Sequence, residues 1–203
     1  SSRRNELVLA MYTYWHSTTL MRFSVERGLR KLGTDYLDVL ILGYFSSRPR
    51  QGLLDVAMDL KQTGLVRHIG LSGHNRKIFP ELAEEGLLDV MQVRYNAVHR
   101  GGEKEIFPLL PDRDRPGVVS FTATDWGKLL KPKKMPPKTD APSAGDCYRF
   151  VLSNPAVDVC LTGPKTLEQM RENLDALERG PMSGGELKRM RRIGDHIYGR
   201  KQG

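Results

Sequence analysis

The feature that most constrains the fold is a regular alternation of short apolar runs with longer amphipathic segments along all 203 residues. Each run is about as long as a buried parallel strand, and most runs are rich in Val, Ile and Leu. We expect strands at residues 7–10, 39–42, 68–71, 91–95, 118–122 and 157–161. The segments between them have helical spacing, so the pattern predicts repeated βα units in one parallel sheet.

Several of the predicted helices carry start or stop signals. Ser24 can cap a helix that ends at Gly33, and Gly86 closes a shorter helix over residues 78–84. Later in the chain, apolar residues at helical spacing predict another amphipathic helix. Its stripe consists of Leu167, Met170, Leu174 and Leu177.

Two architectures are open to such a chain, a doubly wound sandwich and a (β/α)₈ barrel. No Gly-x-Gly-x-x-Gly follows any predicted strand, which weakens the dinucleotide-binding sandwich. The repeated βα units favour the barrel, although six units are two fewer than closure requires. The pattern alone leaves both architectures open.

Composition excludes several classes of protein. Hydrophobic residues make up 39% and charged residues 28% of the chain, which rules out a disordered polyampholyte. No apolar run is long enough to span a membrane, and the first residues lack a signal-peptide pattern. Only Cys147 and Cys160 are present, too few for a disulfide framework. We expect a cytoplasmic protein with no membrane partner.

The net charge of +8 raises the question of nucleic acid binding. The basic residues are scattered, and the dense stretch over residues 128–138 has no aromatic residues between its charges for base stacking. We therefore expect no nucleic acid partner, whereas a phosphorylated small molecule is compatible with the charge. No spacing of His, Cys and carboxylate residues resembles a metal site.

Five ordered segments resemble those of the aldo-keto reductases: residues 32–38, 64–72, 92–96, 118–130 and 163–173. The resemblance implies a TIM (β/α)₈ barrel of the aldo-keto reductase type. It implies a single domain over residues 1–203 in which the first two βα units are missing. The implied function is an NADP(H)-binding oxidoreductase that acts on a small carbonyl or alcohol substrate.

The resemblance places a nicotinamide site at two strand ends. Ser72 and Gln92 offer a hydroxyl and an amide, which can bind the carboxamide at both its donor and its acceptor. Gly73 stands where the family has an Asn, and His74 or Asn75 could substitute for it. The alternative interpretation is a loop cap beside a hydrogen-bonded amide.

Three further residues are expected near the cofactor. By resemblance, Tyr95 stacks against the nicotinamide ring, although a packed aromatic residue explains it equally well. The loop from Thr122 to Lys128 would supply backbone N–H groups and a cation to the pyrophosphate.

The last segment predicts the other end of the cofactor. Lys165 and the hydroxyl of Thr166 lie before a helix, whose N-terminus favours an anion. They would bind a 2′-phosphate, which predicts NADP(H) rather than NAD(H). Gln169 and Asn173 share one helical face and would contact the adenosine. A capped surface helix with solvated polar residues is the competing interpretation.

The expected reaction chemistry is missing from this sequence. The family uses a Tyr acid whose pKa is lowered by a Lys paired with an Asp, and a His that orients the carbonyl. The Asp and the Tyr would precede Ser1. Tyr12 occupies the Lys position, or Met11 if the register slips, and Gly43 occupies the His position.

Substitute acids are Tyr12, Tyr14, Tyr44 and His16, all near the expected mouth of the barrel. We take Tyr12 and Tyr44 as the candidate catalytic residues. A Tyr with no cation beside it keeps a pKa near 10 and is a slow acid at neutral pH. A non-catalytic relative that acts through protein contacts is therefore the alternative function.

The two outer strands would be open edges, which are costly. We expect a preceding segment outside this chain, a homo-oligomer in which two chains close each other, or an incomplete barrel.

Overall fold

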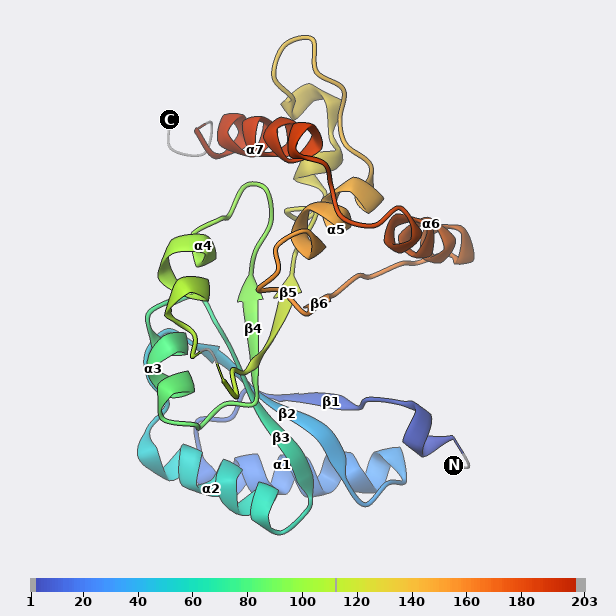
Figure 1. The fold of residues 1–203 in the computed structure, drawn as a ribbon. Coiled ribbons are helices and arrows are strands. Elements are labelled where there is room, and N and C mark those ends of the chain that lie inside the picture. Colours follow the sequence, from blue (N-terminus) through green and yellow to red (C-terminus); the bar gives the residue numbers. More distant parts are fainter. Residues whose placement is uncertain (1–2, 112, 200–203) are drawn as a thin grey trace. The chain divides into compact units, whose positions relative to one another are not determined.

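The computed structural model describes residues 3–111 and 113–199 (Figure 1). The chain divides into two compact units. Unit 1 comprises Ser1–Gln92 and Leu109–Gly117, and unit 2 comprises Val93–Pro108 and Val118–Gly203. Whether they act as the single domain predicted for residues 1–203 stays a prediction.

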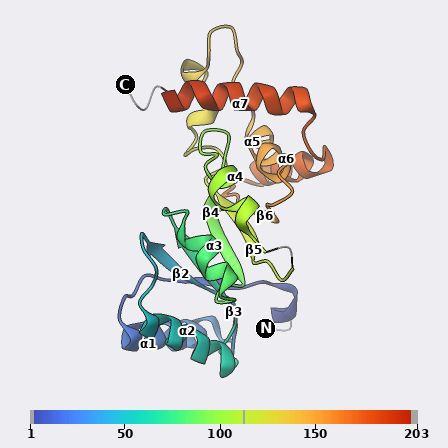
Figure 2. The ribbon, with the colours of Figure 1, turned by 60° about the vertical axis from the view of Figure 1, so that its left-hand side comes forward.

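Unit 1 is built from strands that alternate with helices. Its elements are η1 (Arg4–Glu6), β1 (Ala10–Thr13), α1 (Thr18–Leu32), β2 (Leu37–Phe45), α2 (Gln51–Gln62), β3 (Val66–Gly73), α3 (Ile78–Glu84) and the first part of β4 (Val90–Arg94). The strands are parallel and adjacent in chain order. Figures 1 and 2 show α1 and α2 side by side on one face of β1–β3.

The core of unit 1 follows from β2, which is apolar on both faces. Leu40, Ile41 and Leu42 are all buried, as expected for a central parallel strand. On α1, Met21, Val25 and Leu29 are spaced four residues apart, so they share one side of the helix, and all three are buried. Burial of each such side chain stabilises the fold by about 1.5–3 kcal/mol.

The start of α1 differs from the prediction. Ser17, not Ser24, is the N-cap, and its hydroxyl accepts the Leu20 N–H. Ser24 lies inside the helix, where its hydroxyl donates to the Met21 carbonyl. The predicted end is confirmed, because Gly33 adopts a left-handed conformation that closes the helix.

The first strand also lies further along the chain than predicted. β1 spans Ala10–Thr13 rather than residues 7–10, because Ala10 pairs with Val39 and Thr13 with Leu42. Leu7 and Val8, which carried the apolar signal, are exposed. No lysine lies within this strand in either register.

Unit 2 has fewer strand residues and more helix. Its elements are the end of β4, α4 (Gly102–Glu105), η2 (Phe107–Leu109), β5 (Gly117–Phe121), η3 (Lys128–Leu130), η4 (Pro132–Lys134), α5 (Ala144–Leu152), β6 (Val159–Cys160), α6 (Leu167–Glu178) and α7 (Gly184–Gly199), with Leu109 and Gly117 belonging to unit 1. β5 and β6 are parallel. β6 is shorter than the run at residues 157–161 because only two residues pair with β5.

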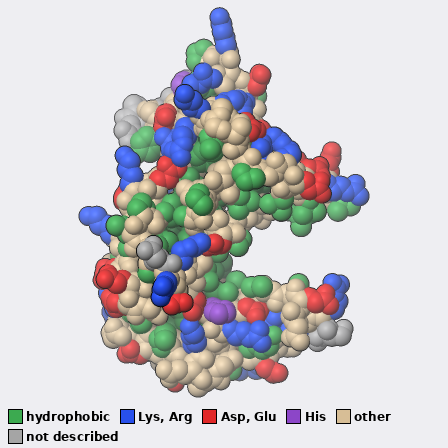
Figure 3. Space-filling model, in the orientation of Figure 1, with side chains coloured by type: hydrophobic (Ala, Val, Ile, Leu, Met, Phe, Trp, Pro, Cys, Tyr) green, Lys and Arg blue, Asp and Glu red, His purple; other side chains and the backbone are tan. Residues whose placement is uncertain are grey.

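The apolar stripe of α6 faces outward. The helix forms where predicted, but Leu167, Met170, Leu174 and Leu177 are each 45–67% exposed, and only Ala176 is buried. Figure 3 shows hydrophobic side chains along this helix. Among the described residues nothing covers the stripe.

Six strands, each followed by a helix, are therefore present in the described chain, and the pairs β1–β2, β2–β3, β3–β4 and β5–β6 are parallel. None of the described helices combines the length and the apolar character needed to cross a membrane.

Candidate functional site

An open pocket of about 910 Å³ has all of its lining residues in unit 2. Its volume is typical of small-molecule sites, which span about 300–1,000 Å³. Three segments form it: the loop after β5, the start of α5, and the turn that leads into α6. The residues facing it from α5 and the preceding turn are Pro142, Ser143, Ala144 and Tyr148.

The start of α6 brings three predicted residues, Lys165, Gln169 and Asn173, to the pocket wall. Thr166 is the N-cap of this helix, and its hydroxyl accepts the Gln169 N–H at 3.2 Å. The Gln169 side-chain oxygen accepts the Lys165 N–H at 2.7 Å, and Asn173 donates to Thr162 at 3.1 Å. Thr166 and Gln169 therefore stabilise the helix start, while the exposed Lys165 brings a positive charge to it.

A second helix also begins at this pocket. Ser143 is the N-cap of α5. Its hydroxyl accepts the Asp146 N–H, and the Asp146 carboxylate accepts the Ser143 N–H. Two helix N-termini and one ammonium group favour an anionic ligand. Glu172 adds one carboxylate to the wall, which favours a ligand that also carries hydrogen-bond donors.

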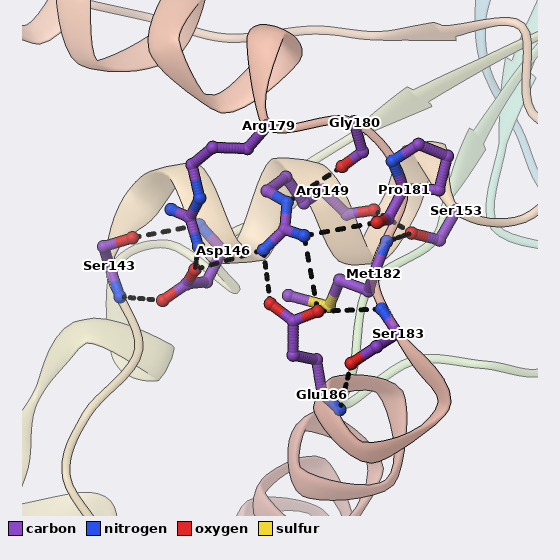
Figure 4. Close-up of polar contacts among 10 residues, drawn as sticks. All are labelled: Ser143, Asp146, Arg149, Ser153, Arg179, Gly180, Pro181, Met182, Ser183 and Glu186. Carbon is purple, nitrogen blue, oxygen red and sulfur yellow. Dashed lines mark hydrogen bonds and ion pairs between the residues drawn. The ribbon is translucent and has the colours of Figure 1, made fainter.

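Ion pairs hold the helices around the pocket (Figure 4). Arg149 on α5 is buried, donates to Glu186 on α7 at 2.6 Å and to the Gly180 carbonyl at 2.9 Å. Arg179 at the end of α6 contacts Asp146 on α5 at 3.0 Å. Hydrogen bonds, first of all from Arg149, lower the pKa of Glu186 to about 2. The pocket walls contributed by α5 and α6 are thus fixed to each other and to α7.

The loop after β5 has an unusual backbone. Thr122, Asp125 and Trp126 all have φ between 48° and 57°, and Gly127 follows at 75°. Non-glycine residues in this left-handed region cost about 1–3 kcal/mol each and gather at functional sites. Trp126 lines the pocket and is 59% exposed.

The same loop offers fewer free amides to a pyrophosphate than predicted. The Asp125 N–H donates to the Thr122 carbonyl, the Gly127 N–H to the Thr124 hydroxyl, and the Lys128 N–H to the Asp125 carbonyl. Thr122 and Lys128 are not among the lining residues. The Lys128 ammonium lies 5.6 Å from the centre of the Trp126 ring.

Tyr95 is packed inside unit 2. Its side chain is 1% exposed, its ring contacts Phe107 and Phe150, and its hydroxyl donates to Glu103 at 2.6 Å. Burial raises the pKa of this phenol. The structure therefore places the ring among core side chains rather than on the pocket wall, as in the packed-residue alternative.

The predicted carboxamide pair lies in unit 1. Ser72 and Gln92 are register partners on β3 and β4, as the sequence predicted. Gln92 is buried, and its amide nitrogen donates to the hydroxyl of Tyr12. A β-carbon at Gly73 would lie 2.5 Å from the Phe45 carbonyl oxygen, so only glycine fits at the position where the resemblance implies an Asn.

A row of aromatic rings occupies the strand ends of unit 1. Tyr12 stacks on Tyr14 with ring centres 5.8 Å apart, Tyr14 lies 5.7 Å from Tyr44, and Tyr44 lies 6.0 Å from His74. Burial raises the pKa of the Tyr12 phenol, although the hydrogen bond from Gln92 opposes this shift. Tyr44 is 72% exposed, with φ of 58°.

The ring of Tyr14 fills the space beside Gly43. A β-carbon at Gly43 would lie 2.6 Å from this ring and 3.3 Å from the Thr13 carbonyl oxygen. A side chain at position 43 would therefore have to displace Tyr14.

Sequence reasoning missed several pocket residues, among them Ser143, Tyr148, Trp126 and Glu172. Ser143 had a usable signal, because Ser followed three residues later by Asp is a capping pattern. Trp126 had none beyond its place in the loop. Within residues 3–111 and 113–199, no cluster of three His, Cys, Asp or Glu side chains could hold a metal ion.

Comparison with solved structures agrees with the predicted fold. The holo form of aldo-keto reductase AKR11C1 from Bacillus halodurans matches 95% of this chain and 74% of its own, with a TM-score of 0.79 and 21% identity. An aldo/keto reductase from Klebsiella pneumoniae, solved in complex with NADP and acetate, matches 95% of this chain and 71% of its own, with a TM-score of 0.77 and 23% identity. The fold is thus that of the aldo-keto reductase barrels over part of their length.

Sequence comparison gives the same family. The uncharacterized oxidoreductase YqkF of Bacillus subtilis is 22% identical over 92% of this chain and 74% of that protein. The NADH-specific methylglyoxal reductase of Escherichia coli is 30% identical over 49% of this chain and 31% of that protein. The model of the Aldo/keto reductase family matches residues 9–144, about two thirds of the chain. With its predicted motifs in order on six parallel strands, the chain belongs to the aldo/keto reductase family of oxidoreductases.

Proposed function

We propose that this protein is a cytoplasmic NADP(H)-binding oxidoreductase whose unit 2 pocket binds the adenosine end of the cofactor. The observation that carries the proposal is Lys165, just before α6, on the wall of a pocket that Gln169 and Asn173 of α6 also line. An ammonium group at a helix N-terminus suits a phosphate, and the volume suits a nucleotide. The residues present thus fit the group.

Preference for NADP(H) over NAD(H) rests on Lys165. The relatives include a protein named as NADH-specific and one solved with NADP, so their names do not decide the question. A lysine beside the ribose would favour the cofactor that carries the additional 2′-phosphate.

When bound, the cofactor supplies or accepts a hydride, and the substrate we propose is a small carbonyl or alcohol compound. In unit 1, the Ser72 hydroxyl and the Gln92 side-chain oxygen would bind the carboxamide. Tyr12, whose hydroxyl accepts from Gln92, is the candidate proton donor, with Tyr44 as the other. The raised pKa of Tyr12 makes it a slow acid at neutral pH, so we expect slow turnover.

Titration with NADPH and NADH, followed by cofactor fluorescence, tests cofactor binding. We expect Lys165→Ala to weaken NADPH binding by about tenfold or more and NADH binding far less. Arg171→Ala is the matched control, since Arg171 lies on the same helix but not among the lining residues. The absence of any fluorescence change at millimolar NADPH would refute the proposal.

The second candidate is a family member that has lost reductase activity and acts through protein contacts. Gly43, with the Tyr14 ring in the adjacent space, favours it. NADPH consumption with a panel of aldehydes and ketones discriminates the two, with Gln92→Ala as the control for background oxidation. Turnover that falls in Gln92→Ala supports the enzyme, and cofactor binding without turnover supports the alternative.

Self-association, which was one way to cover the open strand edges, is also a proposal. Light scattering after size exclusion tests it directly, and a single monomeric species over a hundredfold concentration range would argue against it.

A further inference from the structure

Trp126 is the most exposed large apolar side chain on the pocket wall. Its 59% exposure is unusual for an indole that occupies a concave surface, because such a site normally buries its aromatic residues. The residue is held at a φ of 54°, between Asp125 at 48° and Gly127 at 75°. This conformation projects the indole from a turn that few bulky residues adopt.

The rest of the turn fixes this conformation. Asp125 is fully buried, and its carboxylate lies 3.4 Å from the His99 Nε2. Leu129 is fully buried, and its N–H donates to the Thr124 carbonyl at 3.2 Å. With residues on both sides anchored in unit 2, the backbone of Trp126 is held in place and its exposed ring offers a flat surface beside the pocket.

Two positive groups lie over the ring, within the distance of a cation–π interaction. The Arg94 guanidinium is 5.9 Å and the Lys128 ammonium 5.6 Å from the ring centre. A flat apolar ring with nearby cations suits a ligand that combines a planar base with phosphate groups. Lys165 supplies a further cation on the same pocket.

We propose that the indole of Trp126 stacks on the purine base of the nucleotide whose ribose phosphate is held at Lys165. The proposal rests on the proposed function and adds which residue holds the base. Because all lining residues belong to unit 2, it follows that an isolated purine nucleotide such as adenosine 2′,5′-bisphosphate binds without a nicotinamide half.

Intrinsic fluorescence tests the stacking directly, because the chain has only two tryptophans, Trp15 in unit 1 and Trp126. Trp15→Phe leaves Trp126 as the sole emitter, and Trp126→Phe leaves Trp15. Titration with adenosine 2′,5′-bisphosphate should change the emission of the Trp15→Phe variant saturably. The Trp126→Phe variant should show no change.

Calorimetry measures what the stacking contributes. We expect Trp126→Ala to weaken adenosine 2′,5′-bisphosphate binding about five- to hundredfold, the range that loss of one base–aromatic stack produces. Pyrophosphate, which has no base, should bind equally to the wild type and to Trp126→Ala. Lys165→Ala should weaken both ligands.

The possible results separate this proposal from the proposed function. If adenosine 2′,5′-bisphosphate binds Trp126→Ala as tightly as the wild type, stacking is wrong and cofactor binding stands. If Trp126→Ala weakens pyrophosphate by the same factor, the variant has damaged the pocket and the stacking proposal is also overturned. If the wild type binds neither nucleotide nor NADPH at millimolar concentration, both proposals fail.

Discussion

The family resemblance implies reaction residues at the strand ends of unit 1 and cofactor-binding residues in the pocket of unit 2. The two regions differ in how many of the implied residue types are present. The unit 2 pocket has a lysine, two capped helix N-termini and a volume suited to a nucleotide. At the unit 1 strand ends, Tyr12 and Gly43 stand where the resemblance implies a lysine and a histidine, beside a row of four aromatic rings.

The residues proposed for the adenosine end of the cofactor therefore belong to unit 2, and those proposed for the nicotinamide end and for proton transfer belong to unit 1. Pocket walls in unit 2 depend on helix caps and on the Arg149–Glu186 pair. The strand ends in unit 1 depend on close backbone contacts at Gly73 and on the Tyr14 ring beside Gly43. Neither set of contacts uses a residue of the other unit.

We expect the largest loss of stability from Gly194→Ala, a substitution in unit 2. A β-carbon at Gly194 on α7 would lie 1.9 Å from the Ala97 carbonyl oxygen, so the backbone must shift. We expect a loss of at least about 3 kcal/mol in the free energy of unfolding, together with loss of NADPH binding. Denaturant unfolding and NADPH titration measure the two. Gly185→Ala is the control, because nothing lies near a β-carbon there, and an equal loss in it would contradict the steric argument.

Gly73→Ala applies the same test to unit 1. The Phe45 carbonyl oxygen is 2.5 Å from the added carbon, and we expect a cost of about 1–3 kcal/mol. Binding of adenosine 2′,5′-bisphosphate should persist, because the pocket lies in unit 2. Gly52→Ala, with only an ordinary contact at 3.6 Å, should be close to neutral. Nucleotide binding lost in Gly73→Ala at a temperature where the protein is folded would show that the units are not separable in this way.

A smaller, pH-dependent effect is expected from Glu186→Gln. The folded-state pKa of Glu186 is about 2, below the ordinary 4.5, so its carboxylate stabilises the fold above pH 4.5 and loses this effect as the pH falls toward 2. The wild type should therefore have the higher Tm at pH 7, and the gap should close between pH 4.5 and 2. Glu178→Gln, at an α6 residue with no ion pair among the described residues, should show no such gap. A difference in Tm between the wild type and Glu186→Gln that does not change with pH would contradict the stabilising role of the ionised Glu186 carboxylate.

We expect the smallest change in stability from Trp126→Gly. This variant separates a role of Trp126 in nucleotide binding from a role in folding. Glycine adopts a φ of 54° without strain, and the indole buries little surface. The free energy of unfolding should stay within about 1 kcal/mol of the wild type or rise, while nucleotide affinity falls. Chemical denaturation measures the first and calorimetry the second. A large loss of stability would mean that Trp126 has a structural role.

Sequence patterns predicted the fold well where a single local rule decides the outcome. The helix over residues 78–84 and the stop at Gly33 are confirmed, because a left-handed glycine ends a helix whatever surrounds it. The first strand was misplaced because its register is set by pairing with β2, which no local signal encodes. The stripe of α6 was predicted from periodicity, but periodicity does not say which surface a helix face contacts.

The candidate site could be predicted only in part for a similar reason. Lys165, Gln169 and Asn173 lie in the turn and the helix that follow β6, and all three are on the pocket wall. Tyr95 also follows a strand, but it is buried because its hydroxyl donates to Glu103 on α4 and its ring packs on Phe150 of α5, which is distant in sequence. Trp126 could not be predicted because its exposure depends on three consecutive left-handed residues.

The packing of Tyr14 beside Gly43 has a consequence for how this chain can change. A new side chain at position 43 would evict the Tyr14 ring and separate it from its neighbours on either side. Positions 14 and 43 are therefore coupled, because a side chain at position 43 needs the space that the Tyr14 ring occupies. We expect an imidazole to be tolerated at position 43 only after Tyr14 has been replaced by a smaller residue.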